Sequence, residues 1–192
     1  MIRKISTLSI KAIPLRSYAA ALLMVIALSA SYNPSAEAGP RGIQGGREHA
    51  PPPIATLAIP KIGLNEPVWE GVGRSDLERG VGHFPRTAAP GRWGNTVLLG
   101  HRTTGPAPFR RLGRLSAGDP LDLRAEGRSL RYRVRSVHII TPRQTSVLEP
   151  VPFKPGASPD GRYLSLITCH PKGSDTHRLV VVGEMASPLT GL

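Results

Sequence analysis

Cys169, the single cysteine of the chain, is the residue whose type and setting most directly suggest chemistry. One cysteine forms neither an intramolecular disulfide nor a zinc site of several thiolates, so this thiol either fills a core or reacts. It follows an apolar run, residues 163–168, at a strand-to-loop transition, where side chains are exposed on a rigid support. A cysteine nucleophile is therefore one interpretation, and a buried, inert thiol is the other.

A thiol attacks only as the thiolate, so a catalytic Cys169 needs a neighbouring base or cation. His170 is a poor base for it, because consecutive strand side chains point to opposite faces. His101 is better placed, since it follows a second apolar run, residues 95–99, and Gly100 before it lets backbone or substrate approach closely. Otherwise His101 is an ordinary loop histidine. The remaining candidates are His83, His138 and His177.

Short apolar runs rich in β-branched residues must position these side chains. Beyond Ile54 they are separated by Gly, Pro and Asp, which is typical of a β-barrel or sandwich. Helical periodicity is nearly absent, and we expect only single turns at residues 75–78 and 107–112, the second ended by Gly113. The predicted strands are residues 55–59, 66–70, 95–99, 120–124, 129–139, 163–168 and 178–184.

Two of these strands have distinctive patterns. Residues 129–139 alternate, with Arg131, Arg133 and Arg135 on one face and packing residues on the other. Residues 178–183 show little alternation, which predicts a strand buried on both faces.

Length and composition support one β-rich domain. The 192 residues include 21 glycines and 20 prolines, which argues against a helix bundle. The formal net charge of +12 does not predict nucleic-acid binding, because the arginines are spread singly rather than gathered in a basic run. The acidic residues lack calcium-ligand spacing, so no metal site is expected.

The first 38 residues have the pattern of an export segment. Four Lys and Arg residues precede an apolar run at residues 18–30, and Ala36-Glu37-Ala38 offers a small-x-small cleavage site. The segment is a signal peptide if cleaved or a signal anchor if retained, with the rest of the chain outside the membrane. Residues 39–53, rich in Pro and Gly, are expected to be a flexible linker before a folded domain at 54–192.

The sequence around the candidate residues resembles the signature motifs of sortases. Residues 165–169 read Ser-Leu-Ile-Thr-Cys and resemble the family motif T-L-x-T-C, with Ser165 for the first threonine. Gly-His-Arg at 100–102 resembles the catalytic-histidine motif, and Arg178 sits where sortases carry an essential arginine. The likeness spans residues 56–182 and is greatest to the class E sortases of high-GC Gram-positive bacteria, with class D second.

This resemblance implies an all-β fold, a closed eight-stranded β-barrel with short helical turns, and a cysteine transpeptidase without a cofactor. Cys169 would attack the Thr–Gly bond of an LPxTG-like or LAxTG-like sorting signal, and a cell-wall or pilin amine would resolve the thioester. His101 would be the general acid and base, and Arg178 would bind the substrate carbonyl and the oxyanion. The implied partners are secreted proteins with sorting signals, an amine acceptor and the membrane, not nucleic acid.

The resemblance also suggests substrate-binding residues. Thr168 is carried over as a substrate or oxyanion contact, and is otherwise a β-branched strand residue. Val147 and Leu148 lie in a loop, residues 141–150, where sortases form a groove, and are otherwise core residues. Phe84 replaces the tyrosine of a Gly-His-Tyr-Pro motif that class E sortases associate with alanine in the signal. Weak discrimination between LAxTG and LPxTG is therefore expected.

Two other functions compete with this interpretation. An exported cysteine hydrolase or L,D-transpeptidase acting on peptidoglycan would also use Cys and His, but such L,D-transpeptidases resemble S-x-G-C-x-R around the nucleophile, whereas Ile-Thr precedes Cys169 here. A non-catalytic surface binding module would keep the thiol buried, and slow labelling by a small alkylating reagent would distinguish it.

Overall fold

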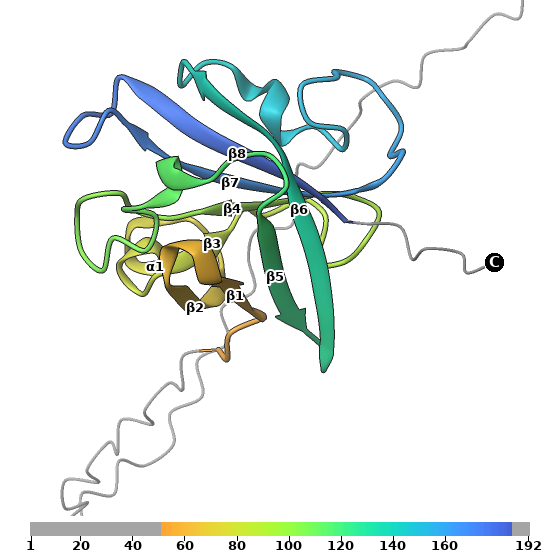
Figure 1. Ribbon diagram of the computed structural model, residues 1–192, viewed down its shortest axis with the longest axis horizontal. Coiled ribbons are helices and arrows are strands. Elements are labelled where there is room, and N and C mark those ends of the chain that lie inside the picture. The colour runs from red at the N-terminus through yellow and green to blue at the C-terminus, as the bar shows by residue number, and fades with distance from the viewer. Residues whose placement is uncertain (1–50, 186–192) are drawn as a thin grey trace, which may run out of the picture. The chain divides into compact units, whose positions relative to one another are not determined.

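Eight strands arise from the short apolar runs, and they close into a barrel in the order β1-β2-β3-β4-β7-β8-β6-β5 (Figure 1). The computed structural model describes residues 51–185. The β2–β3 and β4–β7 pairs are parallel and the other pairs are antiparallel. The strands are β1 (Ala55–Ile59), β2 (Leu64–Glu70), β3 (Val81–His83), β4 (Gly94–Leu99), β5 (Pro120–Ala125), β6 (Arg128–Ile140), β7 (Arg162–His170) and β8 (His177–Met185). The closed eight-stranded barrel expected from the resemblance is confirmed.

Ile54 already takes part in the hydrogen bonding of the barrel. The Ile54 N–H donates to the Val68 carbonyl at 2.8 Å, one residue before β1. The predicted export segment, residues 1–38, and most of the predicted linker, residues 39–53, lie outside the described residues. Among residues 51–185, no helix has the length and apolar character needed to cross a membrane.

Helical structure is limited to short turns. These are α1 (Arg74–Glu78) and the 3₁₀ turns η1 (Pro60–Ile62), η2 (Leu112–Arg114) and η3 (Thr145–Leu148). The turn predicted near residues 75–78 is therefore confirmed. The one predicted at 107–112 is wrong in its bounds, because η2 runs through Gly113 instead of stopping before it. A Cβ at this glycine would lie 3.3 Å from Arg102 Nη2, so Gly113 packs close to the end of the Arg102 side chain.

The sequence prediction missed β3. Its three residues contain only one β-branched side chain, Val81, and Gly82 carries no side-chain signal for a strand. A Cβ at Gly82 would collide with the Gly71 carbonyl oxygen, so a close backbone approach requires glycine there.

The strands bury apolar residues on two sides. The barrel core lies inside, with Leu164, Leu166, Leu179 and Val181 among its residues. A second group, which we name the outer-face cluster, packs beneath the connection between β6 and β7, residues 141–161. It consists of Val97, Ile140, Val147, Val151, Tyr163, Ile167, Val180 and Val182. β8 contributes to both groups, so its predicted burial on both faces is confirmed.

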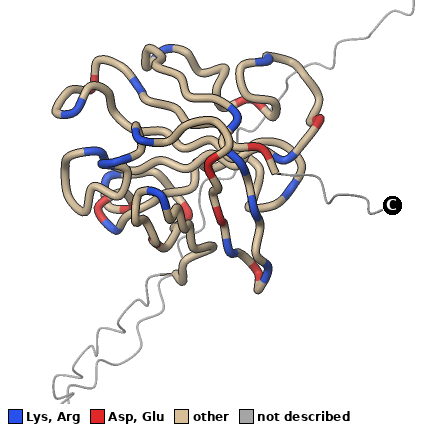
Figure 2. Tube along the Cα trace, in the orientation of Figure 1, with Lys and Arg blue, Asp and Glu red and all other residues tan. Residues whose placement is uncertain are grey.

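Within residues 51–185 the basic residues do not form one patch. Lys and Arg are dispersed along the trace and are interleaved with acidic residues on the β5–β6 hairpin (Figure 2). The predicted arginine face of β6 is exposed, while Tyr132 and Val134 are buried on its other face. Arg131 pairs with Asp122 at 2.9 Å and Arg135 with Glu184 at 2.8 Å. Because its arginines are exposed and two of them are paired with carboxylates, this face of β6 is a solvated surface.

Candidate active site

Cys169 and Arg178 are brought together by the register of β7 and β8. In this antiparallel ladder Cys169 is the direct partner of Arg178, two positions beyond the pair of Ile167 and Val180. Strand side chains alternate between faces, so Cys169 lies on the same face as Ile167, and Arg178 on the same face as Val180. Both side chains therefore project from the outer face of the barrel, at the end of the outer-face cluster.

His101 is held next to this point by the end of β4. The Gly100 N–H donates to the Ile167 carbonyl at 3.3 Å, and the His101 carbonyl accepts from the Phe109 N–H at 3.1 Å. A Cβ at Gly100 would lie 2.9 Å from the Phe109 ring and 3.0 Å from Pro108, which explains the glycine before the histidine. The atoms that approach Gly100 are thus side-chain atoms of Phe109 and Pro108, whereas backbone or substrate is expected there from the sequence.

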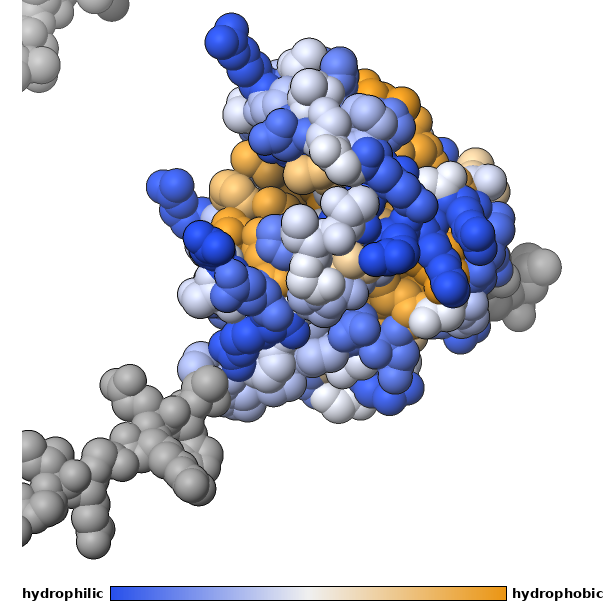
Figure 3. Space-filling view, turned by 90° about the vertical axis from the view of Figure 1, so that its left-hand side faces the viewer, coloured by the Kyte–Doolittle hydropathy of each residue, from blue (hydrophilic) through white to orange (hydrophobic). Residues whose placement is uncertain are grey.

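A cavity of about 300 Å³ joins the two reactive candidates. It lies between the segment after β4 and the loop that connects β7 to β8. Both segments are on the side of the barrel viewed in Figure 3, where apolar residues lie exposed between strongly hydrophilic side chains. The lining residues are His101, Arg102, Thr103, Thr104, Cys169, Gly173, Ser174 and Asp175. A partly exposed thiol and an imidazole thus line one pocket, where both can act on the same bound substrate.

Arg178 lies at the start of β8, and hydrogen bonds hold its side chain to the end of the β7–β8 loop. Its Nη1 donates to the carbonyls of Asp175 at 2.7 Å and His177 at 3.0 Å. No other hydrogen bond of its guanidinium is found among residues 51–185, so Nε and Nη2 remain available for a ligand. A planar guanidinium fixed at one nitrogen can present its other donors in a set direction.

Arg102 is a second guanidinium at the site, and the sequence prediction gave it no role. It is only 8% exposed, and no carboxylate among the described residues lies within ion-pair distance. Its Nη1 donates to the Cys169 carbonyl at 3.0 Å and to His170 Nδ1 at 2.8 Å. Burial lowers the pKa of Arg102 from its ordinary value, an effect that the nearby Cys169 partly offsets. Only its position directly after His101 in the sequence could have indicated that Arg102 lies at the site.

The hydrogen bonds of His170 and His83 argue against their acting as bases. Arg102 can only donate, so His170 Nδ1 is the acceptor in this hydrogen bond. His83 is 4% exposed, with Nδ1 2.7 Å from Glu70 and Nε2 3.2 Å from the Ala88 carbonyl. Both ring nitrogens of His83 are occupied by protein partners, which gives it a structural role.

The four predicted substrate-binding residues lie outside the cavity that holds Cys169. Thr168 is 3% exposed, and its hydroxyl donates to the Gly100 carbonyl at 2.7 Å, so it links the strand before the nucleophile to the strand before His101. Val147 is buried in the outer-face cluster, and Leu148 and Phe84 pack half-buried against it. A direct contact of any of the four with substrate stays a prediction.

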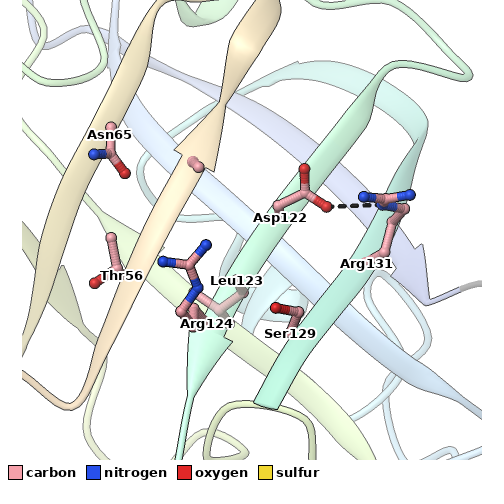
Figure 4. A pocket seen from close by; sticks show the side chains of 8 residues that line it. Thr56, Asn65, Asp122, Leu123, Arg124, Ser129 and Arg131 are labelled. Atoms are coloured by element: carbon pink, nitrogen blue, oxygen red, sulfur yellow. Dashed lines mark hydrogen bonds and ion pairs between the residues drawn. The ribbon is translucent and has the colours of Figure 1, made fainter. Parts of the chain in front are cut away.

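A different hollow, on the strands β1, β2, β5 and β6, has no reactive pair (Figure 4). Asp122 and Arg131 are ion-paired at its edge. Its lining residues, which include Thr56, Asn65 and Ser129, contain neither cysteine nor histidine. Among residues 51–185, no three His, Cys, Asp or Glu side chains lie close enough to hold a metal ion.

Comparisons with known proteins agree with this geometry. The sortase domain model matches residues 57–186. The chain is 38% identical over 140 residues to sortase SrtE1 of Streptomyces coelicolor, covering 69% of this chain and 40% of that protein. It is 34% identical over 131 residues to sortase D of Bacillus subtilis, covering 67% of this chain and 61% of that protein. The match thus spans less than two thirds of either relative.

Solved structures give the same result. Sortase E1 from Streptomyces coelicolor with a tripeptide in its active site superposes with a TM-score of 0.65 at 35% identity, covering 71% of this chain and 89% of that chain. Sortase E from Streptomyces avermitilis superposes with a TM-score of 0.64 at 36% identity, with the same coverage of 71% and 89%. The predicted likeness to class E, with class D second, is confirmed, and the chain belongs to the sortase family.

Proposed function

We propose that this chain is a cysteine transpeptidase that cleaves the Thr–Gly bond of an LPxTG-like or LAxTG-like sorting signal and transfers the new acyl group to an amine. The observation that carries the proposal is the cavity shared by Cys169 and His101, with Arg178 directly opposite the cysteine. Membership of the sortase family supports the same chemistry.

The first half of the reaction forms a thioester. Cys169 Sγ bonds to the threonine carbonyl carbon, and the carbon–nitrogen bond to glycine then breaks. His101 gives its proton to the departing glycine amine. Arg178 donates hydrogen bonds to the negative oxygen of the tetrahedral intermediate, and its charge does not change during the step.

The second half transfers the acyl group. An amine attacks the thioester carbonyl while His101 removes its proton, and the carbon–sulfur bond breaks to regenerate Cys169. The acceptor is an amine of the cell wall or of a pilin, and the acyl donors are secreted proteins with sorting signals.

The proposed location is the outer side of the cell membrane, with the N-terminal segment as a single-pass anchor. The four N-terminal cations and the apolar run after them support this orientation. Protease added to intact cells should digest residues 54–192. Recovery of the protein only in the medium, beginning at Gly39, would instead show cleavage after Ala38.

Mass spectrometry of the products tests the activity directly. Short LPxTG and LAxTG peptides are incubated with the protein and with candidate amines, and the expected product is a peptide that ends in threonine joined to the amine. Cys169→Ala and His101→Ala should each abolish thioester and product while the circular dichroism spectrum stays that of the folded protein, because each removes a reacting group and little core volume. Normal turnover by Cys169→Ala would end the proposal.

A further inference from the structure

A set of buried hydrogen bonds made by Asn95 and Ser165, which we call the latch, joins β4, β7 and the β6–β7 connection. Asn95 is 1% exposed and Ser165 is fully buried. The Ser165 hydroxyl donates to Asn95 Oδ1 at 2.9 Å. Asn95 Nδ2 then donates to the carbonyls of Val147 at 2.8 Å and Glu149 at 3.1 Å. Both donors of the amide are used and its oxygen is occupied, so the amide orientation is fixed by its partners.

These bonds are the only polar tether of the connection's middle part. In the described chain, no other hydrogen bond runs from a barrel strand to residues 142–159. Their remaining contacts with the barrel are apolar or aromatic, such as Val147 in the outer-face cluster and Phe153 beside the His138 ring at 4.6 Å. Apolar contacts are non-directional, so the directional part of the fit comes from one amide.

The latch acts on the same face as the proposed nucleophile. Ser165 and Cys169 are four residues apart on β7, so their side chains project from the same face of the strand. The connection places Val147 and Leu148 against that face. A shift of the connection relative to β7 would therefore change the surface that leads to Cys169.

We propose that Asn95 and Ser165 are positioning residues that hold the β6–β7 connection at the distance from β7 that suits the apolar part of the acyl donor. This inference rests on the proposed function, because it assigns the latch to binding of the sorting signal and not to bond cleavage. It also explains Ser165 at a position where the T-L-x-T-C motif has threonine. Either residue supplies the hydroxyl that Asn95 requires.

Four variants separate the latch from general effects on stability. Asn95→Leu removes all three hydrogen bonds while keeping the branched four-atom skeleton of the side chain. Ser165→Ala removes only the hydroxyl that donates to the Asn95 amide oxygen. Ser165→Thr keeps the hydroxyl. Thr96→Val is the matched control, because it removes another buried hydroxyl bond of β4, the one to the Ala89 carbonyl at 3.2 Å, which does not touch the connection.

Limited proteolysis reports the position of the connection without any substrate. Within residues 142–159 trypsin can cut only after Arg143, because Pro155 follows Lys154. Cleavage between Arg143 and Gln144 should be roughly tenfold faster in Asn95→Leu, which loses both bonds to the connection. It should be about threefold faster in Ser165→Ala, which loses only the bond that supports the amide. Ser165→Thr and Thr96→Val should match the natural protein. Equal cleavage rates in all five proteins would overturn the proposal.

Steady-state kinetics with the LPxTG and LAxTG peptides test the consequence for binding. KM should rise about threefold in Ser165→Ala and up to roughly tenfold in Asn95→Leu, with kcat within about twofold of its original value. A lower kcat at unchanged KM, or no change in either, would overturn the positioning role. If Asn95→Leu does not fold, Ser165→Ala decides. If the natural protein cleaves neither peptide, the proposed function fails, and the trypsin rates alone still decide whether the latch holds the connection.

Discussion

Arg178 faces Cys169 directly across the β7–β8 ladder, and its Nη1 is tied to the carbonyls of Asp175 and His177 in the loop that closes this strand pair. One guanidinium nitrogen fixes the side chain to the loop. The other two are the donors that the proposed mechanism assigns to the negative oxygen of the substrate in the tetrahedral intermediate.

Arg178→Lys should lower kcat/KM about a hundredfold, because one ammonium group cannot hold both loop carbonyls and also present two donors in a fixed direction. The measurement is peptide cleavage by the purified variant at one pH. Arg135→Lys is the control and should leave the rate unchanged, since the one ion pair of Arg135 among residues 51–185 is an exposed pair with Glu184. A fully active Arg178→Lys would show that the arginine only supports the loop.

Thr168→Val should reduce both stability and kcat, whereas Thr168→Ser should behave like the natural protein. The valine keeps the shape but leaves the buried Gly100 carbonyl without the hydroxyl donor at 2.7 Å, a loss of about 1 kcal/mol. This bond links the residues before Cys169 and His101, so their relative position should loosen as well. Thermal melting and peptide cleavage are the two readouts. If valine lowers Tm but leaves kcat intact, the bond is structural only.

The sequence could predict seven of the eight strands and the positions of Cys169 and His101 at strand ends, because both depend on local patterns. Continuous apolar runs mark β4, β7 and β8, and Cys169 and His101 stand where two of these runs end. β3 escaped prediction because its pairing depends on a close backbone approach at Gly82 and not on side chains.

The other residues that shape the site could not be predicted, because their roles depend on partners distant in sequence. Asn95 meets Ser165 and Val147 only after the strands pair and the connection folds back. In the sequence Arg102 has the pattern of an ordinary exposed loop residue. In the structure it is buried, and the end of its side chain packs against Gly113. Side-chain hydrogen bonds between strands leave no periodic signal in a single sequence.

The Lys61–Asp119 ion pair should contribute stability at neutral pH that is lost in acid. The Lys61 ammonium, at 2.7 Å, and the Ser116 N–H hold the pKa of Asp119 below its ordinary value. A folded-state pKa below the unfolded value of about 3.9 stabilises the fold above that pH, and this contribution disappears as pH falls through the folded value. Asp119→Asn should therefore lower Tm near pH 7, with the difference shrinking below about pH 3.

The control for this pH series is Glu126→Gln, which breaks an exposed pair with Arg128 on the β5–β6 hairpin. Exposed pairs contribute little, so its Tm should stay close to that of the natural protein throughout. A Tm difference for Asp119→Asn that is constant between pH 3 and pH 7 would show that ionisation of Asp119 does not stabilise the fold.

Phe84→Tyr should shift peptide preference towards alanine in the sorting signal. Phe84 is fixed through its backbone, with its N–H donating to the Val97 carbonyl at 2.8 Å and its carbonyl accepting from the Thr87 hydroxyl at 2.7 Å. Its ring packs half-buried against the outer-face cluster. The prediction requires the new hydroxyl on this ring to contact the bound peptide. One neutral hydrogen bond to the LAxTG peptide corresponds to a rise of roughly threefold to tenfold in kcat/KM relative to LPxTG.

Two measurements separate this reading from a purely structural role for Phe84. If the ring is only a core aromatic, tyrosine buries an unpaired hydroxyl, which lowers Tm and leaves the ratio of the two peptides unchanged. Phe153→Tyr is the matched control, because Phe153 is the other half-buried phenylalanine against the same cluster, and its variant should not alter the ratio. An unchanged ratio in Phe84→Tyr, or an equal change in Phe153→Tyr, would refute a specific role for Phe84 in reading the signal.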